Sequence, residues 1–331
     1  MSSGSSEFGA AARPIDRNSG TKLDLGIINN IRVNTNGVIA RAGDISTRRS
    51  VKKDYQTAWL LKAVTLIDLT TLSGDDTHGK VQRLCAKARK AINPAIREKL
   101  GLAQSKIPNH TGAVCVYHKH IAEAVQALEG TNIPVAAVST NFPDGQGPEE
   151  TMLEEIRQSV VAGAKEIDIV LTRELVLTQN WQAVYDQVKS YRDACGDAHL
   201  KVILGTGNLG TFENVAKASM VSMMAGADFI KTSTGKEKLN ATLPISLVMM
   251  RQIRDYHEQT GFQIGYKPAG GISTAKDAIT YLAMVKEELG DDWLVPELFR
   301  FGASSLLGDI ERQLDHRATG QYSAPQRLAM S

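Results

Sequence analysis

The sequence is poor in cysteine and contains no long apolar run. Its three cysteines, Cys85, Cys115 and Cys195, have no paired spacing, which argues against a disulfide framework and favours a reducing compartment. No apolar run reaches the length of a membrane span, and no secretory signal opens the chain. We therefore expect a cytoplasmic protein without a membrane partner.

The chain also lacks an excess of charge of either sign. Its 38 basic and 36 acidic residues leave a net charge of +2, so no strongly basic surface predicts a nucleic-acid partner. Apolar residues, in contrast, make up 42% of the chain, which is ample for a large core. A length of 331 residues allows one large domain or two ordinary ones.

Three regions differ in pattern. Residues 1–20 are rich in Ser, Gly and Ala without periodicity, and indicate a disordered tail or a remnant of cloning. Helical patterns dominate residues 21–62, which we expect to form an N-terminal helical segment. Residues 63–331 contain the repeating part of the chain and end in a polar C-terminal tail.

The repeating part alternates short apolar runs with longer amphipathic ones. The runs predicted as strands are Val64–Leu69, Ala113–Tyr117, Val135–Thr140, Glu166–Leu171, Leu200–Leu204, Asp228–Lys231, Gln263–Lys267 and Leu298–Phe301. Strands that alternate with helices predict a parallel sheet covered on both faces. Eight such units favour an α/β fold of the closed (β/α)₈ TIM-barrel type, with an open eight-stranded sheet as the alternative.

A lysine ends one of these runs. The stretch GADFIKTSTGK places Lys231 at the end of a predicted buried strand, before a loop of small residues. A desolvated lysine has a lowered pKa and is the usual nucleophile for Schiff-base chemistry on carbonyl compounds. The alternative is an ordinary strand-end lysine whose amine lies in water.

A second lysine occupies the equivalent position one unit later. Lys267 ends the run in IGYKPAGGI, 36 residues after Lys231. Neighbouring parallel strands would bring both amines to the same end of the barrel, where each disfavours the charge of the other. Asp168 in EIDIV and Asp68 in LIDLTTL are predicted near the same end. Asp168 could equally form a buried ion pair, and Asp68 could cap a loop.

Loops late in the barrel offer backbone N–H groups and hydroxyls. These loops, Thr232–Lys236, Gly270–Ser273 and Gly302–Ser305, follow the last three predicted strands. Loops at these places commonly bind phosphate in barrels of this type, although turn and capping chemistry would explain the same residues.

Two other patterns are weaker. Residues 205–210 match G-x-G-x-x-G, but the acid expected to close the next strand of a dinucleotide site is replaced by Lys231. His118 and His120 could share one face of an extended segment, but no third ligand is evident, so we expect no metal site.

Five motifs together resemble the deoxyribose-phosphate aldolase family. They are LIDLTTL, TNFPDG, GADFIKTSTGK, GYKPAGGI and FGASSLL, in order, and the resemblance runs from about Val51 to the C-terminus. It implies a lyase of the class I aldolase type that cleaves 2-deoxy-D-ribose 5-phosphate reversibly to acetaldehyde and D-glyceraldehyde 3-phosphate. The expected partner is this phosphosugar, used in deoxyribose catabolism without a metal or cofactor.

The resemblance also implies roles for single residues. Lys231 would form the Schiff base, Lys267 would perturb Lys231, and Asp168 would move protons through a water. The residues implied to bind the rest of the substrate are Asp68, Thr70, Cys115, Asn141 and Thr206. Those implied to bind phosphate are Gly235, Lys236, Gly270, Gly271, Ser304 and Ser305.

The chain departs from the family pattern at a few positions. Asn208 stands where Glu is common, and Ser273 stands where Arg is usual, which removes a cation near the phosphate. Tyr322 is a candidate for the family's C-terminal tyrosine in proton transfer. Two rivals stay open, namely another phosphosugar enzyme on the same barrel and a phosphosugar-binding protein without catalysis. Homo-oligomerisation is also left open.

Overall fold

The described part of the chain is built around one eight-stranded parallel sheet. A computed structural model describes residues 15–48 and 51–324. The strands follow one another in chain order, and β8 lies beside β1. They are β1 (Ile67–Thr70), β2 (Ala113–Tyr117), β3 (Val135–Ser139), β4 (Glu166–Val170), β5 (His199–Ile203), β6 (Phe229–Lys231), β7 (Gly265–Lys267) and β8 (Phe301–Ala303). All residues of β3 and β4 are buried, as expected for parallel strands covered on both faces.

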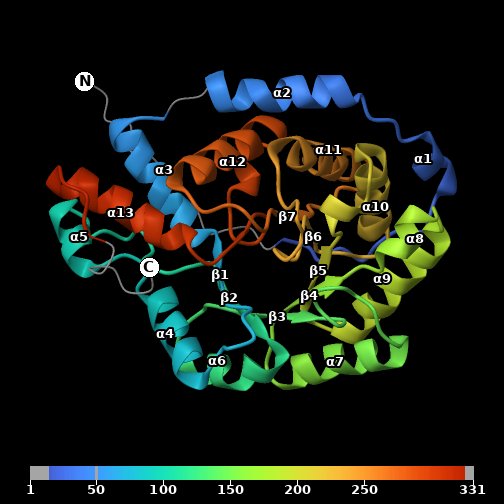
Figure 1. The fold of residues 1–331 in the computed structure, drawn as a ribbon, viewed down its shortest axis with the longest axis horizontal. Helices are drawn as coiled ribbons and strands as arrows, with labels where there is room; N and C mark the ends of the chain where they lie inside the picture. Colours follow the sequence, from blue (N-terminus) through green and yellow to red (C-terminus); the bar gives the residue numbers. More distant parts are fainter. Residues whose placement is uncertain (1–14, 49–50, 325–331) are drawn as a thin grey trace.

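The sheet closes on itself. Backbone bridges join Tyr266 to Phe299 and Ala269 to Gly302, which link β7 to the segment of β8. Figure 1 shows the helices arranged around the strands. The predicted TIM barrel is therefore confirmed, and the open-sheet alternative is wrong.

Helices cover the outside of the barrel and connect successive strands (Figure 1). Before the barrel lie α1 (Leu25–Asn30), α2 (Thr35–Arg48) and α3 (Lys53–Thr65). The helices of the barrel are α4 (His78–Arg89), α5 (Pro94–Lys99), α6 (Ile121–Ala127), α7 (Glu149–Val161), α8 (Arg173–Leu177), α9 (Trp181–Cys195), α10 (Phe212–Met224), α11 (Leu243–Thr260), α12 (Ala275–Glu288) and α13 (Leu306–Thr319). Short 3₁₀ turns are η1 (His118–His120), η2 (Thr206–Asn208) and η3 (Asp291–Trp293).

The predicted strands agree with the observed ones to within two residues at each boundary, except for the first and the last strand. Val64 belongs to α3, and the strand begins only at Ile67, because the apolar run continues the buried face of the helix. The last strand begins at Phe301 rather than Leu298. Leu298 and Phe299 donate their N–H groups to Val295 O in a turn, so pairing with β1 starts three residues late.

The N-terminal helices share the core of the barrel. α2 packs on α11 and α12, and α3 packs on α12 and α13 (Figure 1). Ile28, Val38 and Ile45 belong to the same apolar cluster as the residues beneath the barrel helices. The division into a helical segment and a barrel therefore describes the order of elements and does not separate two cores.

The predicted N-terminal tail, residues 1–20, includes six residues too many at its C-terminal end. Residues 1–14 lie outside the described residues, but residues 15–20 pack on the barrel. The guanidinium of Arg17 contacts both carboxylate oxygens of Asp228 at 2.9 Å. Asn18 is buried, and its amide donates to Met223 O at 2.8 Å and to Ala227 O at 2.9 Å. These contacts attach the start of the chain beside β6, a connection that the polar composition of the segment did not reveal.

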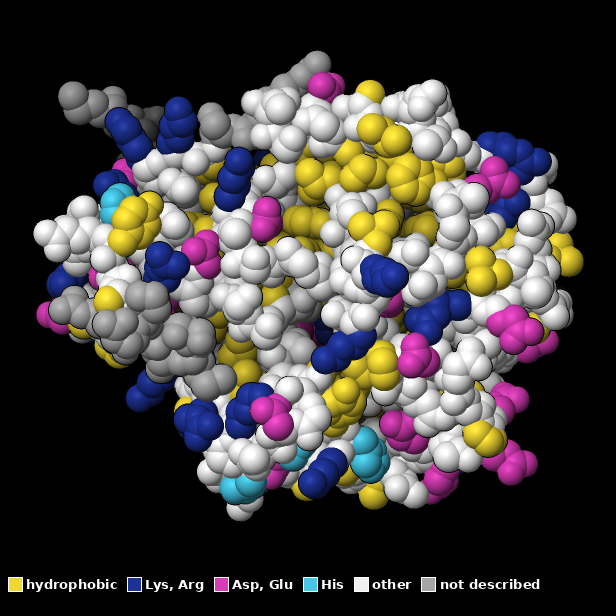
Figure 2. Space-filling view, viewed as in Figure 1, with side chains coloured by type: hydrophobic (Ala, Val, Ile, Leu, Met, Phe, Trp, Pro, Cys, Tyr) yellow, Lys and Arg dark blue, Asp and Glu magenta, His cyan; other side chains and the backbone are white. Residues whose placement is uncertain are grey.

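The surface carries charges of both signs. Figure 2 shows basic and acidic side chains interspersed on one face, with apolar side chains gathered below α2. Among the helices of residues 15–48 and 51–324, none combines the length and the apolar character needed to cross a membrane.

Candidate active site

Neighbouring strands bring the two predicted lysines together. In the parallel pairing of β6 with β7, Lys231 is the direct partner of Lys267. Each is the last residue of its strand, so both lie at the carboxyl end of the barrel. Both side chains are buried. The placement of the two amines agrees with the prediction from their 36-residue spacing.

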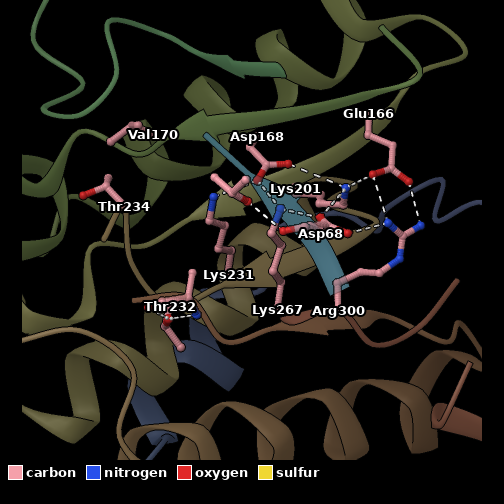
Figure 3. A network of polar contacts seen from close by, with 12 residues as sticks. Asp68, Glu166, Asp168, Val170, Lys201, Lys231, Thr232, Thr234, Lys267 and Arg300 are labelled. Carbon is pink, nitrogen blue, oxygen red and sulfur yellow. Dashed lines mark hydrogen bonds and ion pairs between the residues drawn. The ribbon is translucent and has the colours of Figure 1, made fainter. Parts of the chain in front are cut away.

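A single carboxylate oxygen joins the two amines. Asp168 on β4 accepts a hydrogen bond at Oδ2 from Lys231 Nζ and another from Lys267 Nζ, each at 2.7 Å. Figure 3 shows both lysines pointing toward Asp168 inside the barrel. Lys267 also forms an ion pair with Asp68 Oδ2 at 2.5 Å, whereas Asp168 is the only carboxylate paired with Lys231 among the described residues.

This arrangement shifts the pKa values of the two amines in opposite directions. Burial lowers the pKa of Lys231, and the charge of Lys267 lowers it further, while Asp168 only partly opposes them. Burial also disfavours the charge of Lys267, but Asp168 and Asp68 together hold its pKa well above its usual value. Lys267 is therefore the charged member of the pair, and Lys231 is the amine that can lose its proton.

The two aspartates stay ionised despite complete burial. Burial raises the pKa of Asp168, but Lys231, Lys267 and Lys201 outweigh it and hold that pKa well below its usual range. Lys267, Arg300 and Lys201 do the same for Asp68. The buried ion pair left open at Asp168 is thus present, and its partners are the same two lysines.

The sequence reasoning missed three members of this ionic network. Glu166 on β4, Lys201 on β5 and Arg300 before β8 are buried beside the lysine pair, on the side of the amino ends of the strands (Figure 3). Arg300 contacts Asp68 Oδ1 at 2.6 Å and Glu166 Oε1 at 2.9 Å, and Lys201 pairs with Glu166. A charged residue within a short apolar strand was the available signal, as in HLKVI and LFRF.

A cavity of about 780 Å³ opens above Lys231. Its lining includes Thr70, Lys231 and all the residues predicted to bind phosphate, namely Gly235, Lys236, Gly270, Gly271, Ser304 and Ser305. Lys80 and Arg83 of α4 also line it. Ser273, which stands where the family usually has Arg, lines the same cavity. Lys80 and Arg83 supply positive charge there, and the sequence gives no sign of this because α4 lies far from Ser273 along the chain.

The loops around this cavity need glycine. Gly235, Gly270 and Gly271 have φ of 84°, 81° and 82°, in the left-handed region that favours glycine. A Cβ at Gly270 would lie 2.6 Å from Asn240 Cβ. Ser305 precedes α13 without a capping hydrogen bond from its side chain, so its hydroxyl is not committed to turn chemistry. The N-terminus of α13 therefore faces the cavity with donors that suit an anion.

Several predicted substrate residues do not reach the cavity. Cys115 is buried beside the lysine pair, and burial raises the pKa of its thiol. Thr206 is buried in η2, whereas Asn141 is exposed and its amide donates to Gln146 O at 3.0 Å. Tyr322 stacks on the His316 ring at the end of α13, with the ring centroids 4.1 Å apart.

The weaker patterns have structural explanations. Gly205 adopts a left-handed φ of 67°, and a Cβ at Gly207 would lie 2.0 Å from Leu239 O, so packing accounts for the glycine pattern. His118 contacts Ser159 Oγ at 2.7 Å, and His120 contacts Glu123, so the two rings do not converge. Within the described residues, no group of three or more His, Cys, Asp or Glu could hold a metal ion.

The chain is similar to known aldolases along most of its length. The model of the DeoC/LacD family of aldolases matches residues 62–310. The human protein named deoxyribose-phosphate aldolase is 58% identical over 316 residues, which cover 95% of this chain and 99% of the relative. The mouse protein of the same name is 58% identical over 314 residues, which cover 94% of this chain and 98% of the relative.

Solved structures have the same fold at lower sequence identity. A putative deoxyribose-phosphate aldolase from Toxoplasma gondii has a TM-score of 0.67 at 21% identity, covering 79% of this chain and 96% of that one. The tetrameric deoxyribose phosphate aldolase from Aeropyrum pernix has a TM-score of 0.55 at 23% identity, covering 78% and 96%. At these identities the likeness concerns the fold alone.

Proposed function

The chain belongs to the DeoC/LacD family of aldolases, and we propose that it is a deoxyribose-phosphate aldolase that works through a Schiff base on Lys231. The observation that carries the proposal is the placement of Lys231. Its amine lines the cavity, has a lowered pKa, and shares one oxygen of Asp168 with a charged Lys267. An uncharged amine at an open cavity can attack a carbonyl carbon.

The reaction begins with the open-chain form of 2-deoxy-D-ribose 5-phosphate. Neutral Lys231 attacks the C1 aldehyde, and loss of water leaves a protonated imine. The imine accepts the electron pair of the C2–C3 bond when a base removes the proton of the C3 hydroxyl. Glyceraldehyde 3-phosphate then leaves, and an enamine stays on Lys231. Protonation of this enamine at C2, followed by hydrolysis, releases acetaldehyde and restores the amine.

Asp168 is the group that we assign to these proton transfers. Its Oδ2 accepts a hydrogen bond from Lys231 and another from Lys267, and its Oδ1 forms an ion pair with Lys201 Nζ at 3.6 Å. Because Asp168 directly contacts the amine of Lys231, it is placed to exchange a proton through a water with the substrate bound to that amine. Such transfers by a positioned group contribute about 10²–10⁴-fold to a rate.

The substrate is tested by comparing phosphosugars. We expect turnover of 2-deoxy-D-ribose 5-phosphate, with acetaldehyde and glyceraldehyde 3-phosphate detected as products, and much slower turnover of other pentose and hexose phosphates. Faster turnover of another phosphosugar would indicate a different phosphosugar enzyme on the same barrel. Tight binding of the phosphosugar without a product or a borohydride-trapped adduct would favour the second rival, a binding protein.

The phosphate end of the cavity yields a prediction about Arg83. One charge-assisted hydrogen bond contributes about 1.5–3 kcal/mol, so Arg83→Gln should raise KM for the phosphosugar roughly tenfold with little change in kcat. Lys90→Gln, at an exposed position that ends the same helix, is the matched control. With unphosphorylated 2-deoxyribose the two variants should behave alike. An equal loss on both sugars would contradict a role of Arg83 in phosphate binding.

Self-association and location remain proposals for this chain. The tetrameric relative from Aeropyrum pernix supports a test for self-association of this chain, by light scattering during size-exclusion chromatography. The cytoplasm is the compartment expected from the small number of cysteines.

A further inference from the structure

Three buried charges lie inside the barrel below the lysine pair, and we call them the lower layer: Glu166, Lys201 and Arg300. They do not line the cavity, so they do not touch a substrate bound there. Glu166 precedes Asp168 by two positions on β4, which directs both side chains into the barrel. Lys201 is the strand partner of Asp168 on β5.

The lower layer is continuous with the catalytic groups. Arg300 binds Asp68, and Asp68 binds Lys267. Lys201 Nζ lies 3.7 Å from Asp68 Oδ2 and 3.6 Å from Asp168 Oδ1 (Figure 3). A change of charge in the lower layer therefore reaches Asp168 and the lysine pair through one or two direct contacts in a medium of low dielectric constant.

The charges of this network balance only when one base is neutral. Its members are the acids Asp68, Glu166 and Asp168 and the bases Lys201, Lys231, Lys267 and Arg300. With every group ionised, the four bases exceed the three acids by one positive charge. An unbalanced charge is costly in a buried site, so the network favours the loss of one proton.

Lys231 is the base that can lose this proton at the lowest cost. Arg300 and Lys267 each bind two carboxylates, and Lys201 lies within 4 Å of three. Lys231 contacts only Asp168, and it shares that oxygen with Lys267. It is also the only one of the four bases that lines the cavity.

Other groups that face Lys231 do not alter the balance. The Cys115 thiol on β2 is neutral, since burial raises its pKa. Lys80, Arg83 and Lys236 line the open cavity, where solvent screens their charges. Among the described residues of β3, none is ionisable.

We infer that Glu166, Lys201 and Arg300 are positioning residues that set the protonation state of Lys231 through the charge balance of the buried network. This inference rests on the proposed function, in which Lys231 is the nucleophile. It extends the control of Lys231 beyond its contact with Asp168 and its neighbour Lys267. The opposite charges of Glu166 and Lys201 make the inference testable, because removing one must lower the pKa of Lys231 and removing the other must raise it.

The test compares two single variants of the full chain. Lys201→Met leaves three acids and three bases, which balance when Lys231 is protonated. The midpoint pH for imine formation by Lys231 should therefore rise by about one unit or more, a tenfold change in the neutral fraction below the midpoint. Glu166→Gln leaves an excess of base, so the midpoint should fall by a similar amount. Imine formation is measured over a pH series with acetaldehyde, borohydride reduction and intact mass.

Three further variants complete the design. Glu166→Gln combined with Lys201→Met restores the original excess of one base and should return the midpoint to within about 0.3 units of the original protein. Lys217→Met removes a buried lysine of α10 that pairs with Glu213 outside the network, and should leave the midpoint unchanged. Arg300→Met removes the other cation of the lower layer. It is used in place of Lys201→Met if circular dichroism shows that Lys201→Met does not fold.

Midpoints that move in the same direction, or do not move in folded variants, would overturn the inference, because structural damage has no reason to follow the sign of the deleted charge. Acetaldehyde carries no phosphate, so this result is independent of the assigned sugar. Failure of the original protein to cleave deoxyribose phosphate would overturn the proposed function, while opposite midpoint shifts in the same protein would still support the charge balance.

Discussion

Lys231→Ala should abolish cleavage of 2-deoxy-D-ribose 5-phosphate, with a loss of kcat on the order of 10⁴-fold or more. The side chain supplies the bond that makes C1 an electron sink, and among the described residues no other base of the network lines the cavity. Borohydride reduction in the presence of acetaldehyde should label the original protein once, on the peptide that contains Lys231. Intact mass and peptide mapping check this prediction.

The control for this experiment is a lysine that is buried elsewhere. Lys217→Ala removes an amine of α10 and should keep both turnover and labelling. If Lys231→Ala still forms a reducible adduct with acetaldehyde at the original rate, another amine is the nucleophile and the assignment is wrong.

Lys267→Leu should lower kcat at neutral pH by roughly 10²-fold and move the acidic limb of the pH–rate profile to higher pH. The sign follows from the contacts of Asp168. Without Lys267, Oδ2 of this carboxylate binds Lys231 alone, and the positive charge that lowered the pKa of Lys231 is gone. The pKa of Lys231 therefore rises, and its amine stays protonated up to a higher pH.

Lys267→Arg is the matched variant because it keeps the positive charge. Its larger, planar head group should slow the reaction without a comparable movement of the acidic limb. Profiles of kcat against pH for both variants separate the two effects. An acidic limb of Lys267→Leu at the original pH, or at a lower one, would contradict the proposed control of Lys231 by Lys267.

Much of the architecture could be read from local patterns. The run EIDIV forms a buried strand, as predicted, although two of its five residues are acidic, and Thr274 begins α12 with a capping box. The largest errors in the strand boundaries lie where an apolar run continues from a strand into a neighbouring helix or turn. Val64 extends the buried face of α3, and Leu298 is apolar although it sits in a turn, so hydrophobicity could not locate either strand boundary.

The site was predictable to the extent that its residues end strands. Lys231 and Lys267 close consecutive strands, so their meeting at one end of the barrel follows from the parallel order. Arg83 lies in the middle of a helix, and nothing in its neighbourhood along the chain indicates that it faces the cavity. Asn141 follows a strand as the pattern requires, yet its own loop engages its amide.

The order of apolar and amphipathic runs was enough to predict a parallel barrel with two lysines at one end, because both depend on periodicity along the chain. The choice of Lys231 as the nucleophile came from the resemblance of its motif to a known family. Which amine loses its proton depended on the closed barrel. Asp68, Glu166, Lys201 and Arg300 come from distant parts of the sequence, and their influence on Lys231 depends on separations of a few ångströms in a dry interior. Such distances exist only after the strands have joined.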